Sequence, residues 1–70
     1  MSKRMARKAE KLMISNAGDE LSKLRGAINE AYMAFNSTND PDRLEACIFE
    51  INALQSKYSL ALRNFKSLSL

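Results

Sequence analysis

The segment Asn39-Asp40-Pro41-Asp42 marks the point at which one helix of this chain ends and another begins. Asp40 suits the N-cap position, where its carboxylate accepts a hydrogen bond from a free backbone N–H. Pro41 suits the first helical position, because the N–H that it lacks has no helical partner there. Pro41 also disfavours helical backbone at Asp40, and Asp42 adds negative charge beside the positive end of the helix dipole. We therefore predict a short turn that ends in a capped helix start.

On both sides of this turn, apolar residues recur at alternating steps of three and four, the spacing of one helix face in a coiled coil. The stripe before the turn consists of Leu21, Leu24, Ile28, Ala31 and Phe35. The stripe after it consists of Leu44, Cys47, Ile51, Leu54, Tyr58, Ala61, Phe65 and Leu68, widened by Ile48 and Leu62. We predict an all-α protein in which residues 17–70 form an antiparallel helical hairpin, with helices at about 19–36 and 40–68 and a turn at 37–39.

Residues 1–16 form a basic N-terminal tail, which is either disordered or a helical extension. Its cations are Lys3, Arg4, Arg7, Lys8 and Lys11. The apolar register continues backwards through Ala17 and Ile14, which favours the extension, whereas chain termini are often poorly ordered. The net positive charge is confined to the tail, so the sequence predicts no basic stripe along the folded hairpin.

The two predicted helices differ in length, and this difference leaves apolar residues of the second helix uncovered. At a rise of ~1.5 Å per residue the second helix is ~42 Å long and the first only ~27 Å. The uncovered residues are Ala61, Leu62, Phe65 and Leu68. Either a helical extension of the first helix or a second copy of the chain covers them. Because two helices alone only half-bury each other, we predict a homodimer that forms a four-helix bundle.

The composition excludes several kinds of chemistry. The chain of 70 residues has no His and a single Cys, so it lacks the groups for a His-assisted nucleophile, a zinc finger or an internal disulfide. We expect no catalytic residue, no metal site, no cofactor and no enzymatic activity. Cys47 lies on the apolar stripe and is expected to be a small core residue. A lone cysteine suits a reducing cytoplasm, and no apolar run is long enough to cross a membrane.

Binding is the function class that these observations favour. The candidate interface residues are Tyr32, Phe35, Ile48, Phe49, Tyr58, Leu62 and Phe65. They pack in a homodimer or provide a groove for another protein's helix. The alternative is an accessory nucleic-acid-binding role for the basic tail, through salt-sensitive phosphate contacts. The small apolar face of the tail is not suited to stable membrane association.

The segment from Ala31 onward resembles the YaaL-like family, small bacterial proteins of unknown function. The likeness covers roughly residues 20–68 and rests on the turn at 40–42 together with Ile48-Phe49-Glu50-Ile51-Asn52-Ala53 and an aromatic residue at Tyr58. The chain departs from the family pattern at 43, 49 and 51, and the polar Arg43 argues against packing at that position. The resemblance implies a cytoplasmic bacterial protein and carries over no functional residue.

Overall fold

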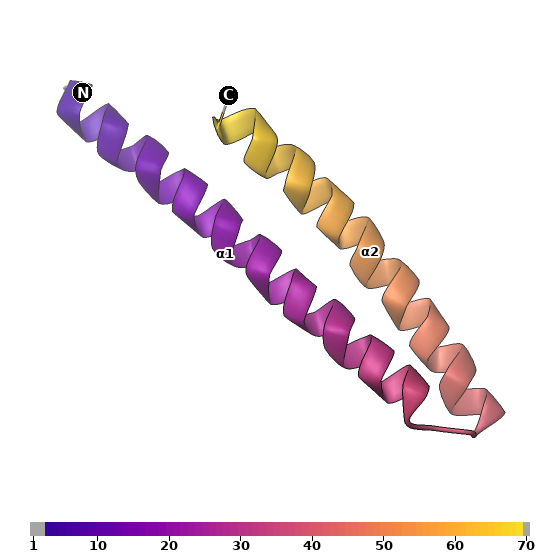
Figure 1. The fold of residues 1–70 in the computed structure, drawn as a ribbon. Helices are drawn as coiled ribbons and strands as arrows, with labels where there is room; N and C mark the ends of the chain where they lie inside the picture. The colour runs from indigo at the N-terminus through magenta and orange to yellow at the C-terminus, as the bar shows by residue number, and fades with distance from the viewer. Residues whose placement is uncertain (1–2, 70) are drawn as a thin grey trace.

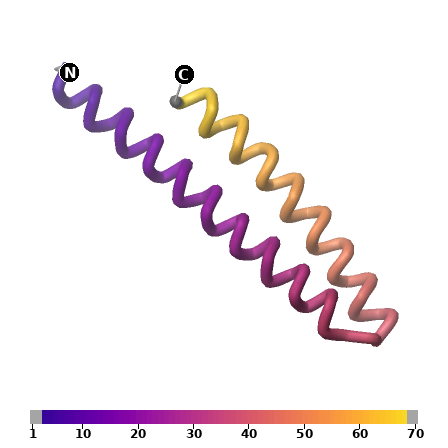
Figure 2. The backbone as a smooth tube through the Cα atoms, in the orientation of Figure 1, coloured from indigo at the N-terminus to yellow at the C-terminus, as the bar shows by residue number. Residues whose placement is uncertain are grey.

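The computed structural model describes residues 3–69 and consists, over that range, of two helices that pack against each other as an antiparallel hairpin (Figure 1). Helix α1 spans Lys3–Asn36 and helix α2 spans Pro41–Ser69. The hairpin measures 58 × 15 × 15 Å, and both ends of the described chain lie at the same end of the rod (Figure 2). The predicted all-α hairpin is thus confirmed. Residues 1, 2 and 70, which the predicted tail and hairpin include, lie outside the described range.

The first helix begins much earlier than the apolar stripe alone predicts. We expected a start near residue 19, but α1 begins at Lys3 and runs without a break through the predicted boundary between residues 16 and 17. Ala17 is buried and Ile14 is half-buried, so the stripe continues backwards as its register allows. Gly18 lies inside the helix, and its cost of ~1 kcal/mol relative to alanine is small against the packing of the extended helix. Of the two alternatives for residues 3–16, the structure has the helical extension.

The connection between the helices is built from local hydrogen bonds. At the end of α1, the backbone N–H of Ser37 donates to the carbonyl oxygen of Ala34 at 3.3 Å, and the Ser37 hydroxyl donates to the same oxygen at 3.1 Å. The backbone N–H of Asp40 donates to Thr38 Oγ1 at 3.2 Å. The N–H of Asp42 then donates to Asp40 Oδ1 at 3.0 Å, which places Asp40 in the predicted N-cap role with Pro41 as the first helical residue.

The interior of the hairpin is a single seam between the helices. The buried residues are Ala17, Leu21, Leu24, Ala31 and Ile51. The remaining members of the two predicted stripes, including Cys47, are half-buried, except for Ile48, which is exposed. No side chain in the described part of the chain is less than 2% exposed. Two helices therefore shield one face of each other and leave both flanks of the seam open to solvent.

One flank of the seam shows the register of the two helices. A Cβ at Gly18 would lie 3.7 Å from Cε2 of Phe65, Arg25 donates to the Tyr58 hydroxyl at 3.0 Å, and Gln55 donates to the Tyr32 hydroxyl at 3.0 Å. The three α1 positions are seven residues apart, so they lie on the same side of the helix. Later residues of α1 meet earlier residues of α2, as antiparallel packing requires. Because α1 extends to Lys3, Leu62 and Phe65 are half-buried rather than uncovered.

Candidate interaction surface

A shallow apolar groove crosses the seam near the turn. Tyr32 and Phe35 of α1 and Ile48, Ile51 and Asn52 of α2 line a depression of about 190 Å³. Tyr32 is 42% exposed and Ile48 is 48% exposed, whereas Phe35 is half-buried and Ile51 is buried at the base of the seam. The structure thus brings together three of the seven predicted interface residues. Large apolar side chains with this degree of exposure favour the binding of another apolar surface over the binding of a small polar ligand.

Cross-helix hydrogen bonds continue the flank away from the groove. Gln55 orients the Tyr32 ring by donating to its hydroxyl oxygen. One heptad further along α1, Arg25 donates to the Tyr58 hydroxyl, and its guanidinium carbon lies 6.0 Å from the centre of the Tyr58 ring. This hydrogen bond, together with the electrostatic interaction with Tyr58, raises the pKa of Arg25 above its ordinary value. Like any exposed arginine, Arg25 carries a positive charge on this flank at neutral pH.

The other predicted interface residues occupy different positions. Leu62 is half-buried on the same flank as Ile48, two heptads further along α2. Tyr58 and Phe65 are half-buried at the seam, where they contribute to the packing of the two helices. Phe49 is 67% exposed and points away from the seam. The exposed large apolar residues that are not among the seven predicted interface residues are Met5, Leu12, Met13, Met33 and Leu60, of which Met33 is the most exposed, at 70%. Their positions outside the two predicted apolar stripes are the feature of the sequence that marks them as exposed.

Because residues 3–11 are helical, the predicted basic tail forms an ordered surface. Lys3, Arg4, Arg7, Lys8 and Lys11 are all exposed and line one shallow hollow on α1. At 3.6 residues per turn, the five positions fall within an arc of about 140° around the helix axis. The expectation that the folded chain carries no basic stripe is therefore wrong, because it took the charged segment and the hairpin as separate parts.

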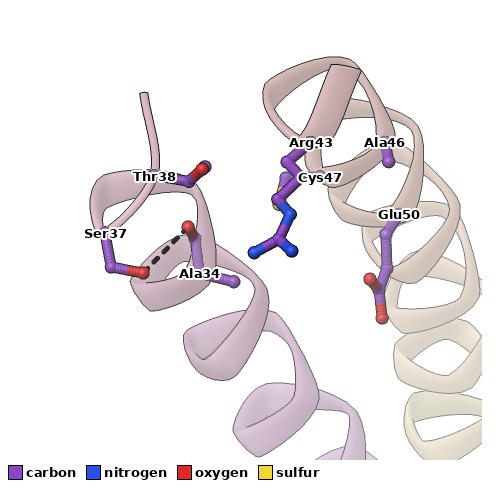
Figure 3. Close-up of a pocket in the computed structure, with 7 residues that line it drawn as sticks. All are labelled: Ala34, Ser37, Thr38, Arg43, Ala46, Cys47 and Glu50. Atoms are coloured by element: carbon purple, nitrogen blue, oxygen red, sulfur yellow. Dashed lines mark hydrogen bonds between the residues drawn. The ribbon is translucent and has the colours of Figure 1, made fainter. Parts of the chain in front are cut away.

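A second recess lies beside the turn and is more polar. It has a volume of about 310 Å³ and is lined by Ala34, Ser37, Thr38, Arg43, Ala46, Cys47 and Glu50. Figure 3 shows the Arg43 guanidinium extending from α2 toward the end of α1, with the Glu50 carboxylate further along α2. Arg43 also lies 3.9 Å from Asp40, in an exposed ion pair that contributes little to stability. The recess contains one half-buried thiol, that of Cys47.

The described residues contain no group of three or more side chains suited to hold a metal ion. Neither α1 nor α2, over its described length, is long and apolar enough to cross a membrane. Every buried side-chain nitrogen or oxygen in the described range has a hydrogen-bond partner, so no orphaned polar group marks a ligand site. The remaining candidate surfaces are the exposed apolar side of the hairpin around Tyr32 and Ile48 and the cluster of cations in residues 3–11.

We define the apolar flank as the side of the hairpin that carries Tyr32, Ile48 and Leu62, and the basic helix face as the five cations of residues 3–11. Both are exposed surfaces rather than enclosed sites. No family model, no curated protein and no solved structure matches this chain, and known proteins therefore add no functional residue to these two surfaces.

Proposed function

We propose that this chain is a non-enzymatic helical hairpin that acts as a self-associating protein–protein interaction module, and that two copies pack through the apolar flank into a four-helix bundle. The resemblance to the YaaL-like family is part of the same proposal and implies a protein of the bacterial cytoplasm. The lone cysteine and the absence of His from the sequence support a binding role in a reducing compartment.

The exposed area of the hairpin carries this proposal. The chain exposes 5827 Å². A folded monomer of its mass, 7.9 kDa, exposes about 4,400 Å² on average, so the hairpin exposes roughly 1,400 Å² more than that. A typical stable interface buries about 800 Å² on each partner. The excess is therefore large enough for a stable interface with one further copy.

The shape of the molecule supports the same conclusion. The radius of gyration is 16.8 Å, against about 11 Å for a compact domain of this length. A rod 15 Å thick is only one layer of paired helices, and it has no second layer to cover the open flanks of the seam. Side-by-side packing of two rods supplies that layer and lets Tyr32 and Ile48 of each copy bury their apolar surface.

Light scattering after size-exclusion chromatography tests the proposal directly. Between ~5 and ~200 μM protein, we expect a mass twice that of the 7.9 kDa chain. Ile48→Glu should shift the protein toward the monomer, because it puts a charge into the proposed interface. Leu60→Glu is the matched control, since Leu60 is exposed on α2 about 120° around the helix from Ile48. A well-folded monomer at all concentrations, or equal effects of the two substitutions, would contradict the proposal.

The basic helix face favours a second candidate function, nucleic-acid binding. Five cations on one side of α1 form a surface that contacts successive phosphates without reading sequence. We expect a DNA duplex to bind at ~50 mM salt and to dissociate near ~200 mM. Lys8→Gln with Lys11→Gln should weaken this binding, whereas Lys23→Gln with Lys57→Gln removes the same charge elsewhere and should weaken it less. Equal losses for the two pairs would exclude the basic helix face as the binding site.

A further inference from the structure

The antiparallel fold separates charge along the rod. Because Gly18 lies beside Phe65 and Arg25 beside Tyr58, residue 21 of α1 is level with residue 62 of α2. We divide the described residues at this level into an open half, residues 3–21 and 62–69, and a turn half, residues 22–61 (Figure 1). The side chains of the open half include seven basic and three acidic residues, a net charge of +4. Those of the turn half include four basic and five acidic residues, a net charge of −1. The positive charge of the hairpin is therefore concentrated at its open end.

This polarity arises from folding rather than from chain order. Along the chain the basic ends flank a slightly acidic middle, and only the antiparallel pairing brings Arg63 and Lys66 to the same half as Lys8 and Lys11. The rod is 58 Å long, several times the Debye length of about 8 Å at physiological salt. The two halves of one molecule therefore neutralise each other poorly, and a second molecule is needed to bring opposite charges close together.

The charged residues along the apolar flank follow the same distribution. Along α1, the residues on this flank at intervals of seven are Tyr32, Arg25, Gly18 and Lys11, so the aromatic end lies near the turn and a cation lies near the open end. On α2, Glu45 is three residues before Ile48 and lies on the outer edge of the same flank. The apolar flank thus has an acidic edge near the turn and a basic edge near the open end.

We propose that the two hairpins of the homodimer pack antiparallel, with the turn half of each copy against the open half of the other. This inference rests on the proposed self-association and adds its geometry. A parallel pair would set +4 against +4 and −1 against −1, whereas the antiparallel pair sets opposite charges together at both ends. The arrangement is a closed two-fold dimer that uses the same flank twice, so it does not extend into fibres. It brings Glu45 of one copy toward Lys8 and Lys11 of the other.

Salt concentration distinguishes the two orientations by the sign of its effect. In the antiparallel dimer the charges attract, so raising the salt from ~50 to ~500 mM should weaken association by screening. In a parallel dimer the charges repel, and the same change should strengthen association. Sedimentation equilibrium of the full chain measures the dissociation constant at both concentrations. A dissociation constant that falls at high salt would overturn the antiparallel arrangement.

Charge reversal on the flank provides a second test. Glu45→Lys and Lys11→Glu should each raise the dissociation constant about tenfold, because each change replaces attraction with repulsion twice across the symmetry axis. The double variant should recover most of the wild-type affinity, which a variant that merely folds badly would not do. Glu30→Lys is the control, since Glu30 is exposed about 200° around α1 from Tyr32 and should have a smaller effect. Failure of the double variant to recover would contradict the proposal.

The distance between spin labels on the two copies tests the antiparallel orientation independently of the proposed self-association. A spin label at Asn39→Cys, in a Cys47→Ala background, marks the turn of each copy; Asn39 is exposed between the helices. In the antiparallel dimer the two labels lie at opposite ends and should be separated by nearly the 58 Å length of the rod, whereas in a parallel dimer they should lie within two rod widths of 15 Å each. A dimer with the short distance refutes the orientation alone. A monomer at every concentration refutes self-association and the orientation with it.

Discussion

Gly18→Ala is expected to stabilise the hairpin, although glycine is normally conserved in packed helices for reasons of space. Gly18 lies in the middle of α1, and a Cβ added there would meet Cε2 of Phe65 at 3.7 Å, an ordinary van der Waals distance. Alanine in a helix interior is better than glycine by about 0.8–1 kcal/mol. The new methyl group also buries apolar area against the Phe65 ring, which contributes up to ~0.5 kcal/mol at a half-buried position. The expected gain is therefore about 1–1.5 kcal/mol.

Gly26→Ala is the matched comparison that isolates the packing contribution. Nothing lies within 4 Å of a Cβ at Gly26, so only the helix propensity of about 1 kcal/mol is gained there. Urea unfolding followed by far-UV circular dichroism, at one fixed protein concentration, gives both free energies of unfolding. For a domain of this size each 1 kcal/mol corresponds to a shift of about 4–8 °C in Tm. If Gly18→Ala destabilises the protein while Gly26→Ala stabilises it, the helices are closer at Phe65 than described and the reasoning is refuted.

Three further substitutions test the turn, the seam and the N-terminal half of α1. Asp40→Ala should lower the free energy of unfolding by about 1 kcal/mol through loss of the bond to the Asp42 N–H, measured by urea unfolding against a nearly neutral Asn39→Ala. Ala31→Leu should cost about 1–3 kcal/mol, because Ala31 is only 5% exposed and a larger side chain separates the helices, whereas exposed Ala53→Leu should cost little in the same assay. Phe65→Ala removes the ring that packs beside Gly18, so amide hydrogen exchange should accelerate more over residues 5–17 than over 28–36; equal acceleration would contradict a local role for Phe65.

The basic helix face and the apolar flank share one residue. Lys11 belongs to both, since it is one of the five cations and also lies on the flank that carries Tyr32. In an antiparallel dimer Lys11 faces the partner's acidic turn half, so polyanion binding and self-association compete for this residue. Dimer dissociation on addition of a DNA duplex at low salt is the expected result of that competition.

The helix boundaries near the turn and the residues of the seam follow from local chemistry. Capping by Asp40 depends on atoms within two residues, and the stripe from Leu21 to Phe35 needs only helical periodicity to be recognised. The start of α1 does not follow from the stripe, because residues 3–13 are exposed apart from the half-buried Ala6 and present no core-facing pattern, although strong helix formers occupy these positions. The packing of α1 against the far end of α2, where Phe65 lies beside Gly18, is likewise a long-range contact. Hairpin formation also joins the two basic ends into one half of the rod and sets Tyr32 beside Ile48. These features require residues distant in the chain to become neighbours, and tertiary packing alone brings that about.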